Sequence, residues 1–130
     1  MNRPEDIRPD YYGGEANPYE VIKAAEEWGW GYEMCMGTAL KYVSRCGKKE
    51  SEDPIKDLTK ARWYVDRATK NRPGHIRKGQ GVTSSMRPSE FAQAHALDPE
   101  LAQAVMYLRQ NDPETALVFI TAALEGMCEA

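Results

Sequence analysis

The chain has 130 residues, of which 42% are hydrophobic and 28% charged, and its formal net charge is −3. This length predicts one compact domain or a small core with an appended element, and the apolar content excludes a wholly disordered chain. No run approaches the roughly 18 apolar residues of a membrane span, the start of the chain is too polar for a signal peptide, and the three cysteines lack a C-x-x-C spacing. We therefore expect a cytoplasmic protein with no membrane partner, no disulfide framework and no zinc site.

Four predicted helix starts share an Asn or Asp followed by proline, at positions 17–18, 53–54, 98–99 and 112–113. The side-chain oxygen can accept from free N–H groups of the first turn, and proline at the first helical position loses no donor that the helix needs. At Asn17 the pattern extends to Glu20, at the spacing of a capping box. Both residues are therefore predicted to cap the first helix.

An extended arm over residues 1–16 is predicted to precede a helical core over residues 17–72. The core contains helices from about 18 to 28, 32 to 46 and 54 to 70, with Gly47 as the stop of the second helix. Their apolar stripes follow helical spacing and comprise Val21, Ile22, Ala25 and Trp28, then Met36, Ala39, Leu40 and Val43, then Ile55, Leu58, Ala61, Val65 and Ala68. The three tryptophans, Trp28, Trp30 and Trp63, are predicted to be core residues rather than a platform for stacking bases.

Residues 73–87 are predicted to form a basic flexible loop, because residues 71–87 hold three glycines and one proline and show no periodicity. Such a loop is either a linker or a lid over a bound phosphate. Beyond it, residues 88–130 predict a short helix near 89–96 and an acidic helical hairpin. No strand pattern competes, so the fold class is all-α: a small domain of three core helices plus a C-terminal helical hairpin, with no β-sheet.

The charges are segregated along the chain. Residues 1–40 carry a net charge of −5, residues 41–87 a net +8 and residues 88–130 a net −6. A concentrated positive segment is typical of proteins with an anionic partner such as a nucleotide or nucleic acid. The alternative is that the acidic flanks fold back and neutralise it. The acidic tail is also a candidate contact for the basic face of another copy, which predicts a homo-oligomer.

The densest group of cations surrounds the second predicted helix. Lys41 and Arg45 are four residues apart and project from the same side, and Lys48 and Lys49 follow in the turn. Lys60 lies on the next helix, close to Asp57. Antiparallel packing of the two helices would form one phosphate-sized site, in which Asp57 orients a cation or approaches a phosphate-bound Mg²⁺. A solvated, salt-bridged surface is the alternative. No P-loop or G-x-G-x-x-G motif is present.

Residues 10–70 resemble a known family. The shared residues are Tyr11-Tyr12, Asn17-Pro18-Tyr19-Glu20, G-x-x-x-K-Y-x-x-R-x-G-K-K from Gly37 to Lys49, and D-L-x-K-A-x-x-Y from Asp57 to Tyr64. This pattern is similar to a phage-borne family catalogued as domain of unknown function 3310 and often described as nucleotide kinase. In one branch, the enzyme phosphorylates deoxynucleoside monophosphates without a Walker motif.

The resemblance implies a (deoxy)nucleoside monophosphate kinase that uses ATP and Mg²⁺ in a bacterial host cytoplasm. It implies catalytic roles for Lys41, Arg45 and Asp57, and metal binding by Asp57 or Glu20. The implied substrate and phosphate contacts are Thr38, Tyr42, Gly47, Lys48, Lys49, Lys60 and Tyr64. Thr38 stands where the family usually has Asn, and Ser44 where it usually has a bulkier residue, so base specificity is expected to differ.

Two other functions are compatible with the sequence. A non-catalytic module could grip nucleic acid or a host protein through the basic segment, and would then show strongly salt-dependent affinity for nucleic acid. An all-α nucleotide pyrophosphohydrolase would need a fuller carboxylate set than Glu26-Glu27 provides.

Overall fold

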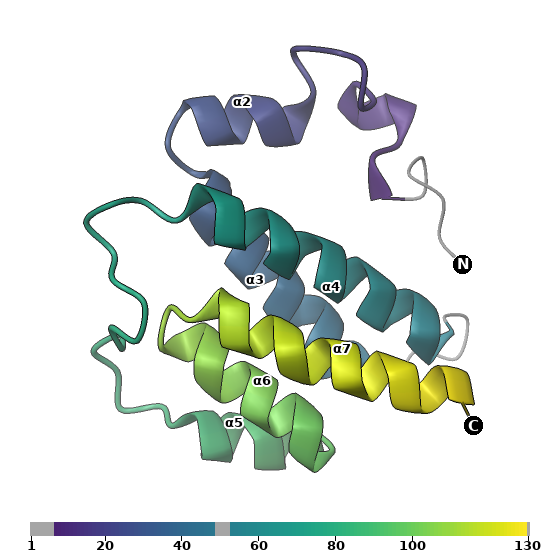
Figure 1. Ribbon diagram of the computed structural model, residues 1–130, viewed down its shortest axis with the longest axis vertical. Helices are drawn as coiled ribbons and strands as arrows, with labels where there is room; N and C mark the ends of the chain where they lie inside the picture. Colours follow the sequence, from purple (N-terminus) through teal and green to yellow (C-terminus); the bar gives the residue numbers. More distant parts are fainter. Residues whose placement is uncertain (1–6, 49–52, 130) are drawn as a thin grey trace.

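The computed structural model describes residues 7–48 and 53–129, and within these ranges the chain forms helices and loops and no strand. The elements in chain order are the 3-10 turn η1 (Asp10–Tyr12) and the helices α2 (Val21–Glu27), α3 (Gly31–Arg45), α4 (Pro54–Asn71), α5 (Pro88–Ala94), α6 (Pro99–Arg109) and α7 (Pro113–Glu129) (Figure 1). The predicted all-α class is confirmed. In the part of the chain that the structure describes, every helix is too short or too polar to cross a membrane.

Two helical hairpins, α3–α4 and α6–α7, share the main hydrophobic core. Helices α4 and α7 pack against each other, and α5 lies against α6 at the far side of the bundle from α2 (Figure 1). The buried residues come from all four long helices: Ala39, Val43, Leu58, Ala61, Val65, Leu101, Ala104, Val105, Leu108, Ala116, Ile120, Ala123 and Leu124. The C-terminal hairpin is therefore half of the core, because the apolar stripe of α4 is covered on one side by α3 and on the other by α7.

Helix α2 differs from its prediction. It begins at Val21 instead of Pro18, and it buries only Ile22 and Ala25, while Val21 and Trp28 face solvent. Trp28 and Trp30 are 67% and 61% exposed, so their assignment to the core is wrong. The chain reverses at Gly29, where φ is +87°, and this turn leaves both indoles outside the bundle, packed edge to face on each other.

The four Asx-Pro sites behave differently from one another. Asp53 accepts a hydrogen bond from the Ile55 N–H, and Asp112 accepts one from the Thr115 N–H, as predicted for helix caps. Asp98 precedes α6 but makes no side-chain cap bond. Asn17 accepts from the Tyr19 N–H in a turn four residues before α2 begins, so the predicted capping box is wrong there.

The segment between α4 and α5 is attached to the turn between α6 and α7. The Asn111 side chain donates to the Gln80 carbonyl at 2.8 Å, and the Lys78 ammonium lies 3.8 Å from the Asp112 carboxylate. The Tyr32 hydroxyl donates to the Asn111 side chain at 2.9 Å, which ties α3 into the same group.

The N-terminal arm, predicted to be extended, contains η1 in its described part and folds back beside α2.

Candidate functional site

A pocket of about 310 Å³ lies between the N-terminal segment, α2, α3 and α4, and we call it the Tyr42 pocket. Its walls carry both polar and aromatic groups. The lining residues are Ile7, Arg8, Pro9, Tyr11, Tyr12, Glu20, Val21, Ile22, Met34, Thr38, Lys41, Tyr42, Lys60, Trp63 and Tyr64. The pocket thus joins three stretches of sequence, and all lining residues except Ile7, Arg8 and Pro9 fall within residues 10–70, the part that resembles a known family.

Three cations surround the ring of Tyr42. The Lys41 ammonium, the Arg45 guanidinium and the Lys60 ammonium lie 4.8, 4.7 and 5.4 Å from the ring centre. Each such contact is worth about 0.5–1 kcal/mol at an exposed site, and the like charges repel one another. Within the described residues, neither Lys41 nor Lys60 forms an ion pair. A bound anion would relieve this repulsion.

Asp57 lies beneath this cluster and orients one of its cations. Its side chain is fully buried, and its Oδ1 accepts a hydrogen bond from Arg45 Nε at 3.2 Å. The other carboxylate oxygen, Oδ2, is buried and has no hydrogen-bond partner. The pairing confirms the prediction that Asp57 holds a cation of this group. The Coulomb attraction between the two groups is strengthened by burial.

At the base of the pocket, Arg8 and Glu20 form a largely buried ion pair. Arg8 Nε and Nη2 donate to the two oxygens of Glu20, the first at 2.9 Å, and the Arg8 guanidinium lies 5.4 Å from the centre of the Trp63 ring. The hydrogen bonds from Arg8 hold the pKa of the Glu20 carboxyl below its ordinary value. This pair attaches the N-terminal segment to α2 and α4. Glu20 stands at the N-cap position of α2, but its side chain makes no cap hydrogen bond.

Aromatic rings form much of the remaining wall. Tyr42 and Tyr64 stack with ring centres 6.2 Å apart, and Trp63 meets Tyr64 edge to face. Burial raises the pKa of the Tyr64 hydroxyl to about 12, so it stays protonated at neutral pH. Tyr11 and Tyr12 pack edge to face on the outer wall, where Tyr11 is 81% exposed. The exposed rings can stack on a planar group that enters the pocket.

The structure brings together most of the residues selected from the sequence. Thr38, Lys41, Tyr42, Lys60, Tyr64 and Glu20 line the pocket, and Arg45 and Asp57 adjoin it. Gly47 and Lys48 lie beyond it, where the Lys48 ammonium donates to the Ser44 carbonyl. Lys49 lies outside the described residues.

Four polar or aromatic lining residues were missed as site residues: Arg8, Tyr11, Tyr12 and Trp63. Trp63 is half-buried and was assigned to the core. The pair Tyr11-Tyr12 belongs to the stretch that resembles the family, and that resemblance was the signal that could have found it. No sequence signal connects Arg8 to Glu20.

The carboxylates near the pocket do not suit a protein-bound Mg²⁺, which needs oxygen ligands with free lone pairs. Both oxygens of Glu20 accept from Arg8, and Asp57, although its Oδ2 has no hydrogen-bond partner, is fully buried and does not line the pocket. Among residues 7–48 and 53–129, no three Asp, Glu, His or Cys side chains are grouped so as to hold a metal ion. The expected metal roles of Glu20 and Asp57 therefore lack support from the geometry.

The acidic flanks neutralise a different part of the basic segment. Arg67 donates to both oxygens of Glu26, at 2.7 and 2.8 Å, and Arg72 donates to Glu114 at 2.7 Å. These pairs tie α4 to α2 and to α7. The neutralised-surface alternative thus holds for the C-terminal half of α4 and the segment after it, while Lys41 and Lys60 remain outside such pairs in the described chain.

The fold and the pocket define a class: a small all-helical protein with a cation-rich, aromatic-walled pocket. Residues 7–66, a little under half of the chain, match the model of a family described as a protein of unknown function (DUF3310). The match contains every residue that lines the Tyr42 pocket, so the pocket lies entirely within the part of the chain that is similar to this uncharacterised family. No curated protein matches the chain, and no solved structure does.

Proposed function

We propose that the Tyr42 pocket binds a (deoxy)nucleoside monophosphate and that the protein transfers a phosphoryl group to it from ATP. The observation that carries this proposal is the gathering of Lys41, Arg45 and Lys60 around Tyr42 at a pocket with aromatic walls. With Arg45 paired to Asp57, the two lysines supply two uncompensated charges. A phosphate monoester carries a charge of about −1.5 to −2 at neutral pH, which balances them.

The pocket also suits the rest of a mononucleotide. Its volume of about 310 Å³ is at the lower end of the range for ligand pockets. Tyr11, Tyr12 and Trp63 offer faces on which a base can stack, and the buried, neutral Arg8–Glu20 pair offers fixed polar atoms. These features favour a nucleotide over inorganic phosphate alone.

In the proposed reaction, an oxygen of the substrate phosphate attacks the γ-phosphorus of ATP. A new P–O bond forms, the bond between the γ-phosphorus and the β,γ-bridging oxygen breaks, and ADP leaves with the electron pair. Lys41, Arg45 and Lys60 position and neutralise the phosphate oxygens, which is the main requirement of phosphoryl transfer. Mg²⁺ enters as part of the ATP substrate, and no described residue is assigned to it.

Binding can be measured by the fluorescence of Trp63, which lines the pocket. The variant Trp28→Phe/Trp30→Phe removes the two exposed indoles, so the remaining signal comes from the pocket. Titration with each deoxynucleoside monophosphate should change this signal saturably. In this background, Lys60→Ala should weaken binding roughly tenfold or more, the effect of losing one charged hydrogen bond.

Lys70→Ala is the matched control, because Lys70 lies on the same helix, faces solvent and pairs with Asp66. It should leave nucleotide affinity unchanged. Equal losses of affinity in Lys60→Ala and Lys70→Ala would show that only the net charge of the protein matters. The proposal would be refuted if none of the mononucleotides bound saturably.

Catalysis requires a separate assay. The protein is incubated with ATP, Mg²⁺ and each monophosphate, and the diphosphate product is separated by ion-exchange chromatography. Binding without product would leave a nucleotide-binding protein and overturn the kinase step. Affinity for single-stranded DNA that falls steeply with salt, with no mononucleotide binding, would instead support the nucleic-acid module.

A further inference from the structure

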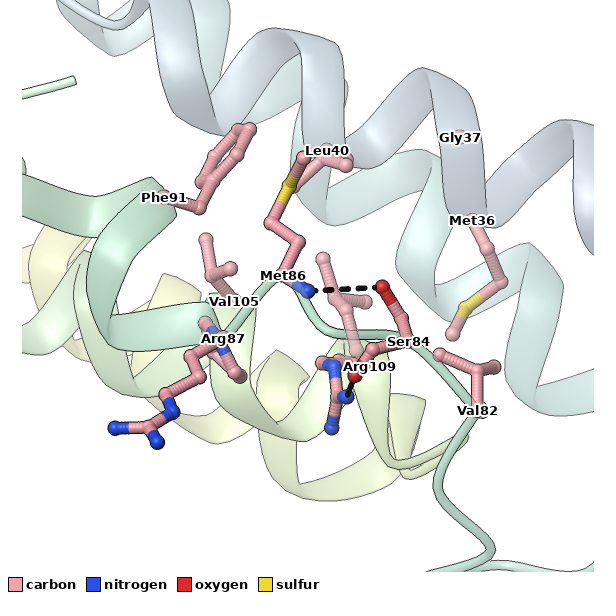
Figure 2. A pocket seen from close by; sticks show the side chains of 12 residues that line it. Met36, Gly37, Leu40, Val82, Ser84, Met86, Arg87, Phe91, Val105 and Arg109 are labelled. Atoms are coloured by element: carbon pink, nitrogen blue, oxygen red, sulfur yellow. Dashed lines mark hydrogen bonds between the residues drawn. The ribbon is translucent and has the colours of Figure 1, made fainter. Parts of the chain in front are cut away.

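A second pocket, of about 300 Å³, borders a different face of α3, and we call it the α3–α6 pocket. It is enclosed by α3, α5, α6 and the segment that leads into α5 (Figure 2). The lining residues are Met36, Gly37, Leu40, Val82, Ser84, Met86, Arg87, Pro88, Phe91, Val105, Leu108 and Arg109. None of them lines the Tyr42 pocket.

The walls of this pocket are apolar. Leu40, Phe91 and Val105 project into it from three different helices (Figure 2). Val82 and Met86, from the non-helical segment, also line it and remain 51% and 62% exposed. A ligand that covered these side chains would remove apolar surface from water, at about 25 cal/mol per Å².

Two arginines stand at the edge of this apolar pocket. Arg87 and Arg109 lie on the side away from α3 in Figure 2. Arg109 is the only Lys or Arg among residues 88–130. Within the described residues neither guanidinium forms an ion pair, and the Glu90 carboxylate accepts from the backbone N–H of Arg87. Arg109 uses one donor on the Ser84 carbonyl, which leaves most of its five N–H groups available.

We propose that the α3–α6 pocket binds a small amphipathic carboxylate, of the class of medium-chain fatty acids. The hydrocarbon chain lies against the apolar walls, and the carboxylate accepts hydrogen bonds from Arg109, while Arg87, whose guanidinium points away from the cavity in Figure 2, adds positive charge at the rim. Guanidinium groups bind carboxylates through two parallel N–H donors, which fixes the orientation of the head group. This site is independent of the nucleotide proposal, because the two pockets share no residue.

The first measurement uses isothermal titration of the full chain with decanoate and with decanol, each below its aggregation concentration. Decanoate should bind at one site per chain. Decanol should bind at least about tenfold more weakly, because it lacks the charged hydrogen bonds. Equal affinities would refute the role of the arginines. Binding to vesicles that contain anionic lipid, without binding of free decanoate, would refute a small-molecule site.

The second measurement blocks the pocket. Gly37 lies in the wall, and a Cβ at this position meets nothing within 4 Å, so Gly37→Leu should place a bulky side chain at the pocket without a clash at its Cβ. Gly126→Leu is the matched control, since Gly126 lies in α7, has equal space and does not line the pocket. Decanoate binding should be lost in Gly37→Leu and kept in Gly126→Leu.

The third measurement removes the charges. Arg87→Gln/Arg109→Gln should weaken decanoate binding roughly tenfold or more and leave decanol unchanged. Arg62→Gln, on the exposed surface of α4, is the control. Decanoate affinity that survives both Gly37→Leu and the double arginine variant would overturn the proposal, whatever the outcome of the nucleotide experiments.

Discussion

The ion pair of Arg8 and Glu20 holds together the part of the Tyr42 pocket that these two residues line. The Arg8 side chain is only 10% exposed, and without Glu20 this largely buried charge keeps only the exposed carboxylate of Glu15, 3.5 Å from Nη1, among the described residues. Glu20→Gln should therefore lower the free energy of unfolding by about 3 kcal/mol. Urea denaturation followed by far-UV circular dichroism measures this change.

The control for this experiment is an exposed pair on the same molecule. Lys70 and Asp66 lie one turn apart on α4 with both side chains largely in solvent. Asp66→Asn should cost less than about 1 kcal/mol. If Glu20→Gln lowered the free energy of unfolding no more than Asp66→Asn does, the Arg8–Glu20 pair would contribute no more than an exposed ion pair.

The same ion pair makes the stability of the folded protein depend on pH. Arg8 holds the pKa of the Glu20 carboxyl below its ordinary value of 4.5, so in acid the unfolded chain binds a proton that the folded chain does not. The stabilisation from Glu20 is complete above its unfolded pKa and is lost as the pH falls through the lower, folded pKa. Urea denaturation from about pH 6 to about pH 3 should show a steeper loss of stability in the wild type than in Glu20→Gln. Parallel curves would contradict this.

At the scale of single elements, two glycines of α3 should respond to alanine in opposite ways. A Cβ at Gly31 would lie 2.8 Å from the Glu26 Cα, so α2 and α3 would have to separate. A Cβ at Gly37 meets nothing within 4 Å. Gly31→Ala should destabilise by about 1–3 kcal/mol, and Gly37→Ala should stabilise by up to about 1 kcal/mol. Thermal denaturation of the two variants compares them directly. Midpoint temperatures that shift in the same direction in both variants would contradict this packing.

The long helices were predictable because their sequences repeat one signal over many turns. Apolar residues at helical spacing in α3 and α4, closed by Gly47 and opened by Asp53-Pro54, defined both helices to within a residue or two. Helix α2 is only seven residues long, and the turn at Asn17 imitates a cap without starting a helix. Local patterns do not show which side of so short a helix is covered, which is why Trp28 and Trp30 were misplaced.

The cation cluster was predictable from spacing, but the pocket itself was not. Lys41 and Arg45 follow from the helical repeat, and Lys60 from the antiparallel pairing of α3 and α4. The other wall comes from Arg8 and η1, which reach the site through one ion pair distant in sequence. Such a contact leaves no periodic trace, so only the structure reveals it.

On the scale of the whole molecule, Asn111 connects three parts of the chain. Its side chain accepts from Tyr32 of α3 and donates to Gln80, and its backbone φ of +55° suits Asn or Gly. Asn111→Gly keeps the backbone conformation and removes both side-chain bonds, worth about 1 kcal/mol each. The segment over residues 72–87 should then open more often, and trypsin should cleave at Arg77 and Lys78 roughly tenfold faster.

Gln110→Ala is the control for this cleavage, because in the described chain the Gln110 side chain makes no bond to the segment. Its cleavage rate should match that of the wild type. Unchanged cleavage in Asn111→Gly would mean that the segment is held by other contacts.

The homo-oligomer expected from the acidic tail stays a prediction, which light scattering of the same samples tests.

Helix α3 is a partition between two cavities. One of its faces presents Thr38 and Lys41 to the Tyr42 pocket, and another presents Gly37 and Leu40 to the α3–α6 pocket. A rigid helix cannot move toward one cavity without moving away from its neighbour, so a ligand that displaced α3 on one side would change the affinity on the other. Linkage thermodynamics requires that this effect be reciprocal: whatever factor an amphiphile imposes on nucleotide affinity, the nucleotide imposes on the amphiphile.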